Sequence, residues 1–163
     1  MDLKKLSIFL KENDIPAFRL KQVREAVYKN FAATWDEIPV LPAPLREKLS
    51  QKFHIHSLFP LETQVSKKND AVKFLFELKD GCKVETVLLN LIPEKWSICV
   101  STQVGCPVRC PFCATGRKGL KRNLSPDEIV DQFLAAAHYL KTKGSHKIGS
   151  VIFMGMGEPL VLR

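Results

Sequence analysis

Residues 105–116 have the sequence GCPVRCPFCATG, which places three of the chain's five cysteines within eight positions. With gaps of three and two residues, Cys106, Cys110 and Cys113 can turn three thiolates toward one face of an iron–sulfur cluster. A fully ligated 4Fe-4S cluster takes four cysteines, so a loop with three leaves one iron open to a small molecule. The spacing therefore predicts a 4Fe-4S cluster at which a reaction takes place.

Other uses of these cysteines fit the pattern less well. A structural zinc site has four protein ligands, commonly in two separated pairs, and the loop has no matching second pair. Cys82, Cys99 or a histidine could supply a fourth ligand, so a zinc-containing module remains an alternative. A disulfide framework is disfavoured, because the number of cysteines is odd, the three are too close for all to pair, and the first residues do not predict an export signal.

The spacing C-x3-C-x2-C, with Phe112 before its last cysteine, resembles the signature of radical S-adenosylmethionine (SAM) enzymes. Further motifs follow one another as they do in the RlmN/Cfr family of adenosine methyltransferases. They are Val84-Glu-Thr-Val87, Cys99-Val-Ser-Thr-Gln-Val-Gly-Cys106, Phe112-Cys-Ala-Thr-Gly116, Arg122-Asn-Leu124 and Met154-Gly-Met-Gly-Glu-Pro-Leu160. The resemblance extends along the whole chain and is most specific after residue 84.

This resemblance implies a radical SAM methyltransferase that uses a 4Fe-4S cluster and S-adenosylmethionine. The implied substrate is an adenosine of 23S rRNA, and of tRNA as well, methylated at carbon 2. A Cfr-like enzyme that methylates carbon 8 is an alternative, as are a radical enzyme with a substrate other than RNA and a non-catalytic zinc or iron–sulfur RNA-binding module. An electron donor such as flavodoxin or ferredoxin is implied as a partner, while the oligomeric state is left open.

The resemblance also assigns roles to four residues outside the cysteine loop. Gly157 and Glu158 are expected to hold the amino group of S-adenosylmethionine. Cys99 is expected to help release a covalent enzyme–RNA adduct and to form a transient disulfide with a second catalytic cysteine, and Glu85 is expected to accept a proton. By themselves, the residues indicate only a turn at Glu158, a small buried thiol at Cys99 and a solvent-facing strand glutamate at Glu85.

Composition agrees with a partner that carries negative charge. The net charge is +8, the sign expected for a protein that binds RNA. A basic stretch after the cysteine loop could hold RNA phosphates or a cofactor carboxylate, although an unpartnered charged loop explains it nearly as well; it consists of Arg117, Lys118, Lys121 and Arg122. Free thiols favour a reducing cytoplasm. No apolar run approaches the roughly 20 residues that cross a bilayer, so no membrane is expected.

The chain is predicted to be α/β, or α+β overall, in three parts. Residues 1–60 show helical periodicity and are expected to be a helical, RNA-binding-like accessory domain. Residues 61–95 alternate around the turn Lys79-Asp80-Gly81, which predicts a β-hairpin connection that ends at Pro93. Residues 96–163 are expected to begin the radical SAM core.

Within that core, the sequence predicts one βαβ unit. Residues 96–101 are expected to form a strand, and Ser125-Pro-Asp-Glu128 predicts a capping box that begins a helix. Residues 148–154 are expected to form a buried parallel strand. By resemblance this is the first unit of a partial (βα)6 barrel, so its last strand should have an unpaired edge. None of the five cysteines matches the family's methyl-carrying cysteine, and the chain is therefore expected to be an amino-terminal fragment that is inactive alone.

Overall fold

The computed structural model describes residues 1–92, 95–144 and 148–161, and its chain divides into two compact units, Met1–Ser57 and Leu58–Arg163. Each unit is described by itself below. The strand break expected at Pro93 lies outside the described residues. Among the residues described, no helix is long and apolar enough to span a membrane.

The first unit consists of three α-helices and one short 3-10 helix. These are α1 (Leu3–Glu12), α2 (Phe18–Tyr28), η1 (Trp35–Glu37) and α3 (Ala43–Lys52). Asp2 caps α1 by accepting hydrogen bonds from the backbone of the first turn. Leu6, Val23 and Leu49, one from each α-helix, are fully buried, which confirms the helical periodicity expected for this part of the chain.

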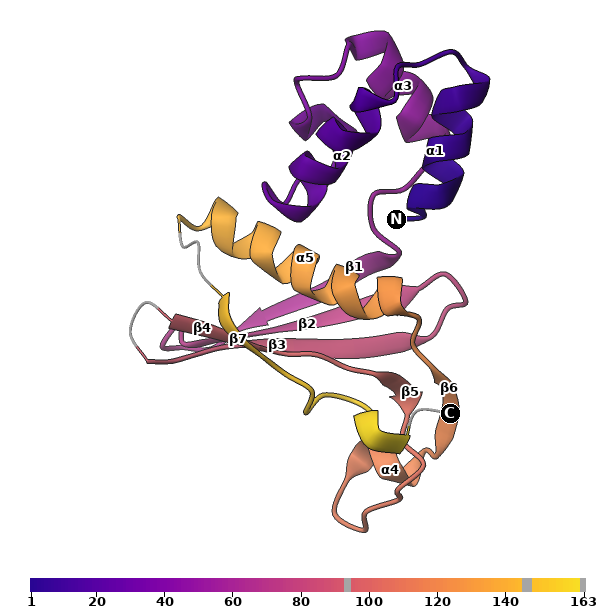
Figure 1. Ribbon diagram of the computed structural model, residues 1–163. Helices are drawn as coiled ribbons and strands as arrows, with labels where there is room; N and C mark the ends of the chain where they lie inside the picture. Colours follow the sequence, from indigo (N-terminus) through magenta and orange to yellow (C-terminus); the bar gives the residue numbers. More distant parts are fainter. Residues whose placement is uncertain (93–94, 145–147, 162–163) are drawn as a thin grey trace. The chain divides into compact units, whose positions relative to one another are not determined.

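The second unit is built on a five-stranded sheet in the order β1-β2-β3-β4-β7 (Figure 1). Its strands are β1 (Leu58–Val65), β2 (Ala71–Leu78), β3 (Lys83–Ile92), β4 (Lys95–Cys99) and β7 (Ile148–Ile152). The first four strands are antiparallel, whereas β4 and β7 are parallel. The α/β class is confirmed. The sequence patterns did not predict β1, because seven of its eight residues are exposed and it shows no alternation.

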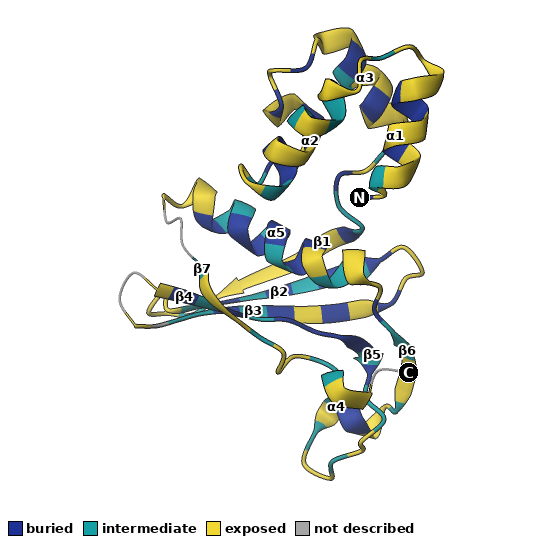
Figure 2. Ribbon diagram, viewed as in Figure 1, coloured by how far each residue is buried: buried dark blue, intermediate teal, exposed yellow. Residues whose placement is uncertain are grey.

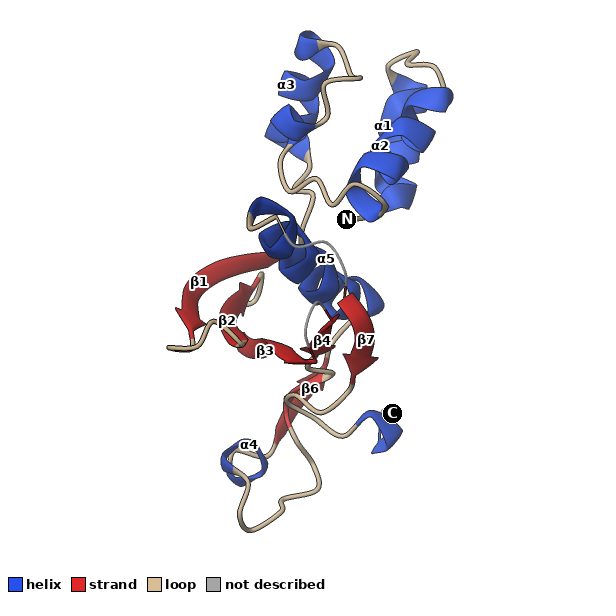
Figure 3. Ribbon diagram, turned by 90° about the vertical axis from the view of Figure 1, so that its left-hand side faces the viewer, coloured by secondary structure: helices blue, strands red, loops and turns tan. Residues whose placement is uncertain are grey.

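Helix α5 (Pro126–Thr142) covers one face of this sheet and forms the core with it (Figures 1 and 3). The predicted capping box is present: the Ser125 side chain accepts from the backbone of Glu128, whose side chain accepts from the Ser125 backbone. Residues of β2 alternate between buried and half-buried, and the buried ones pack under α5 (Figure 2). The path β4–α5–β7 confirms the predicted βαβ unit.

Strand β7 corrects one expectation. It is parallel to β4 as predicted, but its three central residues are exposed (Figure 2). Beyond the strand, Phe153 and Met154 are 50% and 79% exposed. The strand lies at the edge of the sheet, where none of the described elements pairs with its outer side. In β7 the partly buried Ile148 packs against the core, whereas the three central residues are exposed, so an apolar run predicts burial only where it faces the core.

Candidate active site

The cysteine loop is held at its base by a second, small sheet. Strand β5 (Gln103–Gly105) enters the loop and pairs with β6 (Leu120–Asn123), which leaves it; the loop contains the short helix α4 (Ala114–Arg117). Gly105 has a positive φ, and a Cβ on it would lie 1.8 Å from the Gly119 carbonyl oxygen. Only glycine permits this close approach of the two strands. The loop is thus closed at its base, while Phe112 in its middle is 85% exposed.

The three thiols share this loop but are not gathered around a common point. All three cysteines are free and half-buried. In the part of the chain that the structure describes, no three His, Cys, Asp or Glu side chains lie close enough together to hold a metal ion. The backbone N–H of Gly116, with the nearby Thr115 and Arg117, lowers the pKa of the Cys113 thiol. An iron–sulfur cluster is bound by cysteine thiolates, and a lowered pKa favours the thiolate form of Cys113. Three free thiols in one loop therefore fit the ligand chemistry of such a cluster.

Cys99 and Glu85 lie on the same face of the large sheet, away from α5. Cys99 ends β4 and pairs with Val87 of β3, and Glu85 lies two residues from Val87 on that strand. Since side chains alternate along a strand, Glu85, Val87 and Cys99 share a face. The neighbours of Glu85, Val84 and Thr86, are buried on the opposite face, as the sequence predicted.

The environments of these two side chains differ. Burial raises the pKa of the Cys99 thiol, which keeps it neutral at pH 7. Glu85 forms an ion pair with Lys73 at 3.2 Å, and both side chains are over 40% exposed. Glu85 is thus accessible from solvent on the sheet face it shares with Cys99.

The loop after β7 folds back onto the segment between β4 and β5. The Gly155 N–H donates to the Val100 carbonyl, and the Met156 carbonyl accepts from the N–H groups of Thr102 and Gln103. Gly157 has φ +106°, and a Cβ on it would approach the side chains of Thr102 and Gln103 to 2.7 Å. Gly157, which is expected to hold the cofactor's amino group, is therefore also needed for this packing.

Glu158 forms hydrogen bonds through both its backbone and its side chain. Its backbone N–H donates to the Gln103 side chain at 3.0 Å, and its carboxylate accepts from the Leu160 N–H at 3.0 Å. Two carboxylate oxygens together accept about four hydrogen bonds, so this contact leaves capacity for an ammonium group. The side chain is half-buried, which places it at the surface of the pinned loop.

A buried polar network supports the same segment from the α5 side. The Gln132 side chain of α5 accepts from the Ser101 backbone and the Thr86 hydroxyl, and donates to the Ser101 carbonyl. The Ser101 hydroxyl donates to the Glu85 carbonyl and accepts from the Met156 N–H. The network is completely buried at Ser101, Thr86 and Gln132. Its hydrogen bonds tie together three chain segments that carry predicted site residues.

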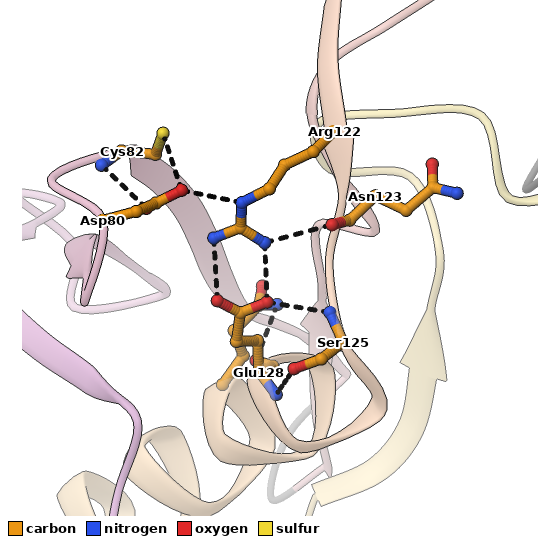
Figure 4. A network of polar contacts seen from close by, with 7 residues as sticks. Asp80, Cys82, Arg122, Asn123, Ser125 and Glu128 are labelled. Carbon is orange, nitrogen blue, oxygen red and sulfur yellow. Dashed lines mark hydrogen bonds and ion pairs between the residues drawn. The ribbon is translucent and has the colours of Figure 1, made fainter.

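Arg122 is engaged in ion pairs within the protein (Figure 4). Its guanidinium donates two bonds of 2.9 Å to Glu128 and one of 2.8 Å to Asp80, which lies in the β2–β3 turn. These bonds hold β6 against the start of α5. Of the basic stretch expected to contact RNA or a cofactor, Arg117, Lys118 and Lys121 are exposed, whereas Arg122 is committed to this clamp.

The clamp also shifts the titration of its members. The hydrogen bond from Arg122 holds the pKa of Asp80 far below its ordinary value. Burial alone would raise the pKa of Glu128, but the bonds from Arg122 and the Ser125 backbone outweigh it and lower that pKa. Cys82 is buried and donates its thiol hydrogen to Asp80 at 3.3 Å.

Sequence reasoning did not single out Ser101, Gln103 or Gln132. Ser101 and Gln103 lie inside the motif 99–106 that supports the family resemblance, but that motif assigned them no role, and all three side chains are completely buried. A buried polar side chain needs partners, and those partners usually belong to other elements.

Comparisons with known proteins agree with this arrangement. Residues 100–163 match the family model described as Radical SAM superfamily. The chain is 42% identical over 153 residues to a Chlorobium phaeobacteroides protein named "Probable dual-specificity RNA methyltransferase RlmN", a match that covers 90% of this chain and 41% of the relative. It is 44% identical over 154 residues to "Ribosomal RNA large subunit methyltransferase Cfr" of Bacillus velezensis, a match that covers 93% of this chain and 42% of that relative.

The chain is a homologue of the RlmN/Cfr methyltransferases. A crystal structure of a radical SAM methyltransferase from Sphaerobacter thermophilus superposes with a TM-score of 0.86 at 37% identity, and the match covers 98% of this chain and 46% of that one. The expected resemblance to the RlmN/Cfr family is confirmed, and the fold matches part of a radical SAM methyltransferase. The chain spans less than half the length of the curated relatives that it matches.

Proposed function

We propose that this chain carries the cluster-binding part and part of the cofactor site of a radical SAM RNA methyltransferase. The observation that supports this most strongly is the segment 101–105. One side of it leads into the three-cysteine loop, and the loop 155–158 folds onto it through backbone and side-chain hydrogen bonds. A cluster and a cofactor must lie next to each other for electron transfer, and this segment is in contact with both candidate binding loops.

In this proposal, Cys106, Cys110 and Cys113 are the cluster ligands, and Gly157 and Glu158 bind the amino group of S-adenosylmethionine. When bound, the cluster and S-adenosylmethionine supply the radical chemistry that modifies an aromatic carbon. Glu85 accepts a proton on the sheet face that it shares with Cys99. Cys99 takes part in the release of the RNA, including through a transient disulfide with a cysteine outside this chain.

The proposed substrate is an adenosine of 23S rRNA, with tRNA as a second substrate, methylated at carbon 2. Methylation at carbon 8 is the second candidate, since the Cfr relative is as similar to this chain as the RlmN relative is. The proposed setting is the cytoplasm, with flavodoxin or ferredoxin as the electron donor. The positive charge of the chain supports contact with RNA, and we assign part of that contact to the helical unit.

Metal analysis tests the cluster assignment. After anaerobic reconstitution, the purified chain should contain iron and acid-labile sulfide and show the absorption of a 4Fe-4S cluster. Alanine in place of Cys106, Cys110 or Cys113 should abolish this absorption. Cys82→Ala is the matched control, because it removes a thiol outside the loop and should keep the cluster. Stoichiometric zinc in place of iron would support the alternative of a zinc module.

The substrate is tested with a chain of the relatives' full length. Expressed in cells that lack their own adenosine methyltransferases of this type, it should add one methyl group to an adenosine of 23S rRNA. Digestion of the RNA and chromatography against 2-methyladenosine and 8-methyladenosine standards separates the two candidates. Unmodified rRNA and tRNA from cells that contain cluster-loaded protein would refute the RNA methyltransferase proposal.

A further inference from the structure

We propose that Gln103 is a positioning residue, whose side chain sets where the loop 155–158 lies relative to the cysteine loop. Gln103 is completely buried. Its Oε1 accepts from the Glu158 backbone N–H at 3.0 Å, and its Nε2 donates to the Asn123 Oδ1 at 2.9 Å. A backbone N–H can only donate, so the atom facing Glu158 must be the oxygen, and the amide nitrogen then faces Asn123.

Gln103 lies where its two side-chain hydrogen bonds connect the cysteine loop with the loop 155–158. Gln103 begins β5, three residues before Cys106, and Asn123 is the last residue of β6, which leaves the cysteine loop. The side chain therefore joins the strand entering the loop, the strand leaving it and the loop that carries Glu158. A change in this one side chain alters the relation of all three segments.

The packing around Gln103 leaves little room for the loop to shift. A Cβ on Gly157 would come within 2.7 Å of the Gln103 Cβ. The aliphatic part of Gln103 thus acts as a spacer beneath Gly157, while its amide holds the next residue, Glu158. Both residues proposed to bind the cofactor's amino group rest on this one side chain.

This role rests on the proposed function, because its effect on cofactor binding requires that Gly157 and Glu158 contact S-adenosylmethionine. Gln103→Leu keeps most of the volume but removes both hydrogen bonds. In the chain without cluster or cofactor, we expect amide hydrogen exchange at Glu158 to become about tenfold faster, the effect of losing one hydrogen bond. In the reconstituted chain, we expect the Kd for S-adenosylmethionine to rise about tenfold while the iron content is kept.

Three further variants separate positioning from a general loss of stability. Val72→Ala is the matched control, because it removes buried side-chain volume from the core of the same unit, on β2, where Val72 pairs with Val65 and Leu88. It should leave the Kd within about twofold of the original. Asn123→Leu should weaken cofactor binding severalfold by releasing the Gln103 amide, whereas Asn123→Asp, whose carboxylate still accepts from Gln103, should restore it.

The outcomes distinguish this role from the proposed function. Unchanged Glu158 exchange in Gln103→Leu, or an equal loss of affinity in Val72→Ala, would overturn the positioning role. If Gln103→Leu does not fold, equal affinities of Asn123→Leu and Asn123→Asp would overturn it instead. A reconstituted original chain that fails to bind S-adenosylmethionine would refute the proposed function, and exchange at Glu158 would then decide the positioning role alone.

Discussion

Replacement of Arg122 by glutamine is expected to destabilise the sheet unit by about 2 kcal/mol at about pH 7. Hydrogen bonds to charged groups contribute about 1.5–3 kcal/mol each, and removing one partner of a well-buried ion pair costs about 3–5 kcal/mol. Here the exposed fractions of the side chains are 32% for Arg122, 12% for Glu128 and 41% for Asp80. Partial exposure reduces the cost, which places the expected value below that of a fully buried pair.

This destabilisation should depend on pH in a defined direction. The pKa values of Asp80 and Glu128 are lowered in the folded chain. A lowered pKa stabilises the fold above the carboxyl's ordinary pKa, and that stabilisation is lost as the pH falls through the folded value. The difference in the free energy of unfolding between the original chain and Arg122→Gln should therefore be constant near neutral pH and shrink below about pH 4.

The fluorescence of Trp96 provides the assay. The chain has two tryptophans, Trp35 in the helical unit and Trp96 in β4 of the sheet unit. In a Trp35→Phe background, urea unfolding followed by fluorescence therefore reports on the sheet unit alone. Both the original Arg122 and the glutamine variant are measured at neutral and acidic pH.

A surface ion pair serves as the control for this prediction. Lys73 and Glu85 are paired at 3.2 Å with side chains 41% and 47% exposed, and exposed pairs contribute about 0–1 kcal/mol. Lys73→Gln should therefore cost clearly less than Arg122→Gln. Equal costs for the two variants, or an Arg122→Gln deficit that persists unchanged in acid, would show that the guanidinium does not clamp the sheet unit.

Three other predictions concern the candidate site. Gly157→Ala should weaken S-adenosylmethionine binding at least tenfold, because Gly157 has a positive φ and a Cβ there would make contacts of 2.7 Å. Calorimetry measures the affinity, and an unchanged affinity would argue against the observed packing. In the unloaded chain at neutral pH, Cys113 should react with an alkylating reagent faster than Cys99, because the pKa of Cys113 is lowered and that of Cys99 is raised. Mass spectrometry measures the two rates, and the reverse order would contradict these pKa directions. With S-adenosylmethionine added, the electron paramagnetic resonance signal of the reduced, reconstituted chain should change, whereas Glu158→Gln should need a higher cofactor concentration for the same change.

Features that depend on neighbouring residues could be predicted from the sequence. The capping box at Ser125, the turn at Gly81 with its positive φ and the alternation along β2 all agree with the structure. The grouping of three cysteines in one loop is also local. Each of these features arises from contacts within a few positions, so the order of residue types contains the necessary information.

Features that depend on distant contacts could not be predicted in this way. Arg122 belongs to a basic stretch in the sequence, but its partner Asp80 lies 42 positions away. Residues 148–152 are apolar enough for a buried strand, yet β7 lies exposed at the edge of the sheet. Whether a charge is free or paired, and whether an apolar strand is covered, depends on which elements pack beside it.

The sequence by itself predicted the kind of chemistry, because the types and spacing of the candidate ligands are properties of a short segment. The tertiary structure decided how the candidate site is held together. Gln103 contacts Glu158 across 55 positions, and Gln132 reaches Ser101 across 31. Buried polar groups must find partners, and in this fold the partners come from strands and loops that only the folded sheet brings together.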